Sequence, residues 1–174
     1  TATLGNIVLG TITSDSGVAG THDIAVTALA GSITINSSVT SDDDVNLNAN
    51  TTISDNASDN NADILGNTVS LTAVTGLGSS GNTLDLDVVT VTSATSASGG
   101  VYLNLLDANN SGVTVSSATA TTSGDIVLEA TSGSGTKTYT TVTAANGNIS
   151  VTATQGDIVL GALTASATAS KSIS

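Results

Sequence analysis

Acidic residues in one loop are the part of this chain best suited to bind a ligand. Asp55, Asp59 and Asp63 recur every fourth residue in a stretch that is otherwise rich in Asn. Carboxylate oxygens are hard ligands of the kind that Ca²⁺ takes in proteins, so these three residues form a candidate calcium site. Their spacing differs from that of an EF-hand loop and from that of the calcium-binding nonapeptide roll. The competing interpretation is that they are solvated turn carboxylates, in which case the chain carries no cofactor.

A second pair of acids could support catalysis. Asp85 and Asp87 lie two residues apart in an apolar run, so they share one face of a strand and point away from Leu86. Glycoside hydrolysis needs two carboxylates that face one groove. A solvated strand face explains the same pair, and lyases that resemble pectate lyase rely on basic residues, whereas this chain has no Arg. We therefore expect that the chain is not an enzyme and has no catalytic residues.

The remaining polar signals are less specific. His22 is the only histidine and is followed by Asp23, but no nucleophile motif of the Gly-x-Ser-x-Gly type accompanies them. A solvated turn is the expected environment of His22. Antifreeze solenoids present Thr-x-Thr pairs once per coil, and this chain has such pairs at irregular intervals. Because Thr is also a good strand former, the sequence favours a strand role over ice binding. The pairs begin at Thr1, Thr11, Thr90, Thr119, Thr136, Thr141 and Thr152.

The composition excludes several classes of partner. The 174 residues include 14 acids but only Lys137 and Lys171 as basic side chains apart from the histidine, which gives a net charge of -12. Binding of nucleic acid or of an anionic membrane needs basic residues, so we expect neither partner. No stretch approaches the roughly 20 apolar residues of a membrane span. The absence of Cys excludes disulfides and thiolate metal sites.

One short phrase recurs along the whole chain. It consists of Gly, then Asp or Asn, then a run in which every second residue is apolar. Alternation with a period of two makes a strand with one apolar face, and the Gly allows the turn before it. Copies return at roughly 15 to 25 residues, which is within the range of solenoid repeats. The best copies are 124–130, 147–153 and 156–162.

These repeats predict an all-β fold, a parallel β-helix or β-solenoid with roughly 20 residues per coil. Residues 1–174 form a single solenoid segment, because no composition change or linker divides them. The core would consist of Val, Ile, Leu and Ala ladders, since only Tyr102 and Tyr139 are aromatic. A solenoid leaves open strand edges at both ends. We therefore expect its partners to be adjacent solenoid repeats or identical subunits placed end to end, as part of a longer array or filament.

The repeated phrase resembles the shaft repeats of filamentous-haemagglutinin-like adhesins, bacterial exoproteins often exported by two-partner secretion. The resemblance implies a right-handed parallel β-helix, secretion to the bacterial cell surface, and adhesion to host cells, to sister cells or to a polysaccharide matrix. It predicts a structural shaft of a cell-surface adhesin or extracellular fibre. The alternative is a carbohydrate-binding or polysaccharide-active β-helix protein. The ligand-binding residues of the family have no counterpart in the phrase itself.

Overall fold

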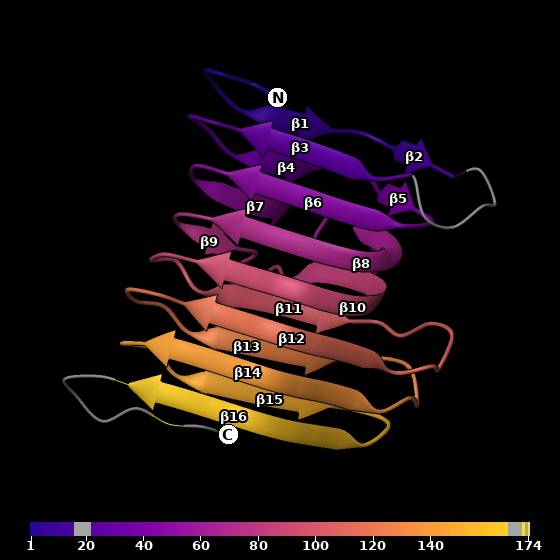
Figure 1. Ribbon diagram of the computed structural model, residues 1–174, viewed down its shortest axis with the longest axis vertical. Helices are drawn as coiled ribbons and strands as arrows, with labels where there is room; N and C mark the ends of the chain where they lie inside the picture. The colour runs from indigo at the N-terminus through magenta and orange to yellow at the C-terminus, as the bar shows by residue number, and fades with distance from the viewer. Residues whose placement is uncertain (16–21, 167–171, 173) are drawn as a thin grey trace.

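The computed structural model describes residues 1–15, 22–166, 172 and 174. It confirms the predicted all-β parallel solenoid, which has about seven turns of roughly 24 residues each. The coil is thus longer than the expected value of about 20, because several coils carry long corner loops. Within the described ranges there is no helix, and hence no helix that could span a membrane. The two ends of the chain lie at opposite ends of the stack (Figure 1).

In the part of the chain that the structure describes, sixteen strands build the solenoid, and all pairings between them are parallel. The first eight are β1 (Ile7–Leu9), β2 (Ile12–Ser14), β3 (Ile24–Ala28), β4 (Ile33–Ile35), β5 (Val39–Ser41), β6 (Asp44–Ala49), β7 (Thr52–Asp55) and β8 (Ile64–Ala73). The second eight are β9 (Gly76–Leu77), β10 (Leu84–Ser96), β11 (Val101–Leu105), β12 (Val113–Ala120), β13 (Ile126–Ala130), β14 (Lys137–Ala145), β15 (Ile149–Ala153) and β16 (Ile158–Ser166).

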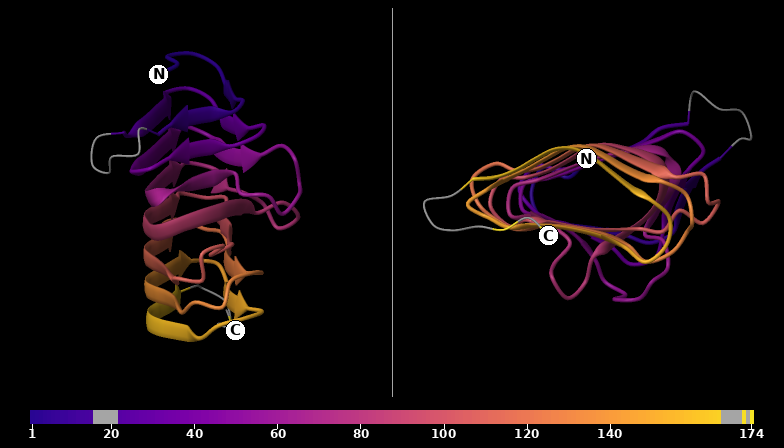
Figure 2. Two further views of the ribbon diagram at one scale, coloured as in Figure 1. Left: turned by 90° about the vertical axis from the view of Figure 1, so that its right-hand side faces the viewer. Right: turned by 90° about the horizontal axis from the view of Figure 1, so that it is seen from below.

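The strands form two long walls and a shorter third column. One wall contains β1, β4, β7, β9, β11, β13 and β15 in succession. The other contains β3, β6, β8, β10, β12, β14 and β16. In the first coils, β2 and β5 continue into the start of β8 and form the third column. Seen along the stack, the coils superimpose as a flattened ring (Figure 2).

Equivalent apolar residues stack on one another inside this ring. In one wall the ladder contains Val45, Val69, Val91 and Val115, and Tyr139 then takes the same position. All five side chains are at most 1% exposed. Branched aliphatic residues suit such ladders because the same shape repeats in every coil and fills the narrow interior. This pattern confirms the expected core.

Glycines are required at one corner, where successive coils approach closely. A Cβ added to Gly99 would collide with the carbonyl oxygen of Thr75, and one added to Gly147 would collide with that of Gly124. Gly124 itself has φ +117, a conformation that other residues rarely adopt. The Gly of the repeated phrase therefore has two roles: it adopts a backbone conformation that other residues rarely adopt, and it lets successive coils approach closely.

Candidate functional site: a buried carboxyl network beside two polar pockets

Two loops project from the side of the solenoid and enclose small polar pockets. Residues 56–63 connect β7 to β8, and residues 78–83 connect β9 to β10 (Figure 2). The pocket between the two loops has a volume of about 230 Å³, and Asp59, Asn60, Asn82 and Glu129 are among its lining residues. A second pocket of about 380 Å³ lies on the other side of the first loop. Asp59 lines both pockets, so the position of this loop determines their shape.

The two ends of the 56–63 loop are joined by carboxyl groups. Asp55 is the last residue of β7 and Asp63 directly precedes β8. The side chains of Asp55 and Asp63 are hydrogen-bonded to each other. Asp55 also accepts hydrogen bonds from the backbone N–H groups of Ala57 at 2.8 Å and Ser58 at 2.7 Å. These bonds fix the start of the loop to its end.

The network continues through three further coils. Asp63 Oδ2 accepts a hydrogen bond from the backbone N–H of Asp85 at 2.8 Å. Asp85 Oδ1 accepts one from Asn104 Nδ2 at 2.8 Å. Asn104 Oδ1 in turn accepts bonds from the backbone N–H and the hydroxyl of Thr131. Asp55, Asp63, Asp85 and Asn104 are all at least nine-tenths buried, so the network is an internal feature of the corner.

Three buried carboxyl groups without a basic partner cannot all be charged. Among the described basic side chains, Lys137 and His22 lie against Asp107 and Asp42 instead. Burial, and then the neighbouring charges of Asp55 and Asp85, raise the pKa of Asp63 to about 8, although the bond from the Asp85 backbone lowers it. Burial also raises the pKa of Asp85. At neutral pH, Asp63 is therefore protonated, and its carboxyl O–H donates a hydrogen bond to the carboxylate of Asp55.

Burial by itself would raise the pKa of Asp55 as well. The hydrogen bonds that Asp55 receives from Ala57, Ser58 and Asp63 outweigh this effect and lower its pKa. The two partners of the same hydrogen bond thus shift in opposite directions. Their unequal hydrogen bonding decides which carboxyl group keeps the proton.

The three predicted calcium ligands lie in different environments. Asp55 and Asp63 are buried in the network, whereas Asp59 is exposed and accepts hydrogen bonds from the backbone and side chain of Asn61, both at 2.8 Å. Among the residues that the structure describes, they do not form a set of three acids with mutually close ligand atoms. Calcium binding at Asp55, Asp59 and Asp63 stays a prediction.

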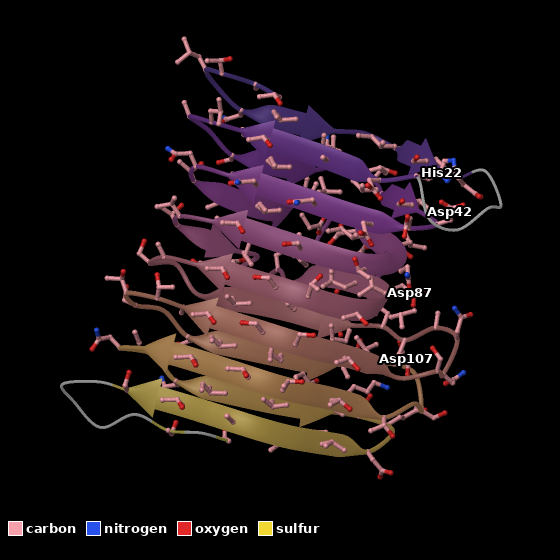
Figure 3. The ribbon with its side chains drawn as sticks, in the orientation of Figure 1. His22, Asp42, Asp87 and Asp107 are labelled. Atoms are coloured by element: carbon pink, nitrogen blue, oxygen red, sulfur yellow. The ribbon has the colours of Figure 1, made fainter. Side chains whose placement is uncertain are left out.

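A different group of three acids does come together. Ligand atoms of Asp23, Asp43 and Asp44 lie within 4.8 Å of one another. Asp23 comes from the coil before the other two, so a spacing argument within one loop could not find this group. Nearby, His22 Nδ1 lies 3.6 Å from Asp42 Oδ1 (Figure 3). The turn position expected for His22 thus lies at an acidic corner.

The pair Asp85 and Asp87 does not lie on an open strand face. Asp85 is 2% exposed, so the expectation of a solvated face is wrong for this residue. Asp87 is half-buried and accepts a hydrogen bond from the backbone N–H of Ala108 at 3.0 Å. Asp85 is instead held in the buried network by Asp63 and Asn104, which period-two alternation alone does not reveal.

The sequence analysis did not predict a buried ion pair that lies at a neighbouring corner. Lys137 Nζ donates to Asp107 Oδ2 at 2.9 Å and to the carbonyl oxygens of Gly133 and Gly135. Asp107 also accepts hydrogen bonds from the backbone N–H groups of Gly112 and Gly135. Figure 3 shows Asp107 at the same edge of the solenoid as Asp87. The available signal was that Lys137 and Tyr139 occupy alternate positions in a strand, where other coils carry apolar residues.

Comparison of the chain with protein-family models, with curated proteins and with the solved structures finds no match.

Proposed function

We propose that this chain is a structural shaft of a secreted bacterial surface adhesin or extracellular fibre. In this function the stacked coils form a stiff rod that holds an adhesive end away from the cell. The adhesive end would attach to host cells, to sister cells or to a polysaccharide matrix. No catalytic residue or cofactor takes part in this mechanism.

The observation that supports the proposal most directly is the open stacking at the end of the solenoid. Ile158 and Leu160 of the last long strand are 38% and 51% exposed. Their counterparts one coil earlier, Lys137 and Tyr139, are fully buried. Ser172 and Ser174 hydrogen-bond to Ile149 and thus lie on β15 as a further coil would. The edge of β16 therefore suits a neighbouring repeat or an identical subunit.

The charge and composition also favour a passive rod. The two Lys and no Arg leave few sites for trypsin-like proteases, and Lys137 is fully buried. The absence of Cys means that the chain needs no oxidation during export. Parallel ladders join every coil to the next, so load along the rod is shared by many backbone hydrogen bonds.

Electron microscopy of the native protein that contains this chain tests the proposal. We expect a thin rod with a coil spacing of about 4.8 Å, and immunogold label against this chain on the outside of intact cells. Compact particles would contradict the shaft function. Label confined to the cytoplasm would contradict the surface location.

The two side pockets favour a second candidate, a carbohydrate-binding shaft. Their linings are rich in the amide and hydroxyl groups that bind sugars, for example Asn60, Ser80 and Asn82 in the first pocket. NMR titration with neutral oligosaccharides would test this function. Asn60→Ala should weaken binding, whereas Asn109→Ala, an exposed asparagine on the 106–112 loop, is the matched control. Equal binding by both variants would exclude the first pocket.

A further inference from the structure

Threonine side chains align in a row across five consecutive coils. The strand register pairs Thr72 with Thr95, Thr95 with Thr119, Thr119 with Thr143, and Thr143 with Thr164. The residues on either side of each of these threonines are more buried, as expected where the threonine points outward. Figure 1 looks onto this wall, in which β8, β10, β12, β14 and β16 follow one another down the stack.

A second row of hydroxyl groups runs beside the first. It consists of the residues two positions earlier in four of these strands, which are Ser70, Ser93, Ser117 and Thr141. The register pairs Ser70 with Ser93 and Ser117 with Thr141. Within single coils, the Ser93 and Thr95 hydroxyl groups are 3.2 Å apart and those of Ser117 and Thr119 are 3.4 Å apart. We call the two rows together the hydroxyl face.

The hydroxyl face is a regular two-dimensional array. Neighbouring strands are about 4.8 Å apart, and alternate residues of one strand are about 6.6 Å apart. Backbone hydrogen bonding sets the first spacing and the extended backbone itself sets the second, so the array is ordered without any ligand. No charged side chain belongs to either row, although the chain as a whole carries 14 acids. Each threonine contributes one hydroxyl and one methyl group.

These properties select the chemistry of the partner. The two polar pockets are lined by other residues, so the face offers a small solute no enclosure. A charged ligand would find no countercharge in the rows. A crystalline sugar surface would find no aromatic platform, because neither tyrosine belongs to them. The partner that fits this face is therefore an extended neutral lattice that repeats hydrogen-bonding groups in two dimensions.

We propose that the hydroxyl face binds ice. The hydroxyl groups form hydrogen bonds with lattice water, and the methyl groups occupy the spaces between water molecules. Each contact is weak, but a rigid array makes many of them at once, so that they act as one multivalent site. This inference does not depend on the proposed shaft function.

The Thr-x-Thr pairs of the sequence do not reveal this arrangement, because only Thr119 and Thr143 of the row belong to such pairs. Thr72 and Thr95 are separated by 23 residues and Thr143 and Thr164 by 21, because corners differ in length. The pairing of the strands nevertheless aligns these threonines, because the extra or missing residues lie in the corners. The row is a different set of residues from the Thr-x-Thr pairs, and the register does not align those pairs once per coil.

The test is partition of the 174-residue chain into slowly growing ice, with serum albumin in the same solution as the reference protein. We expect the chain to be enriched in the ice relative to albumin. Thr119→Tyr places a ring above the centre of the hydroxyl face and should lower the enrichment by roughly tenfold or more, since a loss of about 1.4 kcal/mol suffices for that change. Thr152→Tyr places the same ring at an exposed position of β15, in the other wall, and should leave the enrichment unchanged.

Urea midpoints equal to that of the wild type would show that both variants fold. If Thr119→Tyr is destabilised, Thr143→Glu tests the same face by adding a charge to it. Enrichment no greater than that of albumin would overturn the proposal. Equal losses in Thr119→Tyr and Thr152→Tyr would also overturn it. Binding to crystalline chitin or cellulose that depends on Thr119, without enrichment in ice, would assign the face to a polysaccharide instead.

Discussion

Lys137 Nζ lies 2.9 Å from Asp107 Oδ2, and both side chains are almost completely buried. Lys137 takes the position that Val113 and Ile158 occupy in the adjacent coils. Its aliphatic stem therefore extends the apolar ladder, while its ammonium group reaches the corner. An ion pair thus replaces one step of the aliphatic core.

Replacing Lys137 by Met should destabilise the fold by about 3–5 kcal/mol, because Asp107 is left as a buried charge without its partner. Met fills a similar volume, so the loss reports on charge more than on packing. Urea unfolding at pH 7 measures it. The double variant Lys137→Met/Asp107→Asn should recover most of the loss. A single variant as stable as the wild type would show that the pair contributes nothing.

The proton on Asp63 should make stability fall as the pH rises. The folded state holds this proton up to a pKa of about 8, whereas an ordinary aspartate loses it near 3.8. Unfolding therefore releases a proton between these values, and stability decreases by at most about 1.4 kcal/mol per pH unit. Asp63→Asn does not titrate and preserves the hydrogen-bonding pattern of the protonated acid. It should flatten this decrease in urea unfolding measured from pH 5 to pH 8.

Asp59→Asn is the control for that experiment, because Asp59 is an exposed acid in the same loop. This variant should keep the wild-type dependence on pH. Asp85, whose pKa is also raised, contributes in the same sense as Asp63 and remains in both variants. An unchanged slope in Asp63→Asn would show that another group holds the proton.

Tyr139→Phe should stabilise the protein. The hydroxyl group of Tyr139 is buried and has no hydrogen-bond partner among the described residues. Burial raises the pKa of Tyr139 to about 12. Because an unpaired buried hydroxyl costs about 1–3 kcal/mol, its removal should raise the unfolding free energy by roughly 1 kcal/mol. Tyr102→Phe, at a half-buried site, should change stability little, and a loss of stability in Tyr139→Phe would contradict the assignment.

Gly99→Ala should be among the most damaging small changes in the chain. The added Cβ would collide with the Thr75 carbonyl group of the previous coil, which cannot move without breaking the ladder. We expect a loss of about 3 kcal/mol or more, as for other severe steric changes. Gly81→Ala is the matched control, because no atom lies within 4 Å of its added Cβ. Similar urea midpoints for the two variants would refute close packing at this corner.

The fold could be predicted because the same local signal occurs in every coil. Residues 124–130 and 147–153 carry the repeated phrase, and the structure pairs Ile126 with Ile149 in the expected parallel register. Alternation of period two decided which residues enter the core. The number of residues per coil was harder to predict from the sequence, because it depends on the lengths of corner loops, which follow no pattern.

The site could be predicted only in part, because it depends on contacts between coils. The sequence singled out Asp55 and Asp63 but gave no indication that a proton joins them. Asn104 and Thr131 were not predicted, because they are ordinary polar residues in the sequence. The fold places Asn104 against Asp85, and Thr131 against Asn104. Such contacts connect residues about one coil apart, and the varying corner lengths hide that distance in a linear sequence.

The unequal corners have a consequence for the growth and redesign of such rods. Paired residues in neighbouring coils are separated by as few as 19 residues, between Leu86 and Leu105, and as many as 27, between Ile12 and Val39. The strands of both walls nevertheless stay paired in parallel from coil to coil, with one register shift between Val91 and Ser93. Extra segments can therefore be gained at a corner without disturbing the scaffold, and a peptide grafted between Asp59 and Asn60 would be displayed on the flank of the rod.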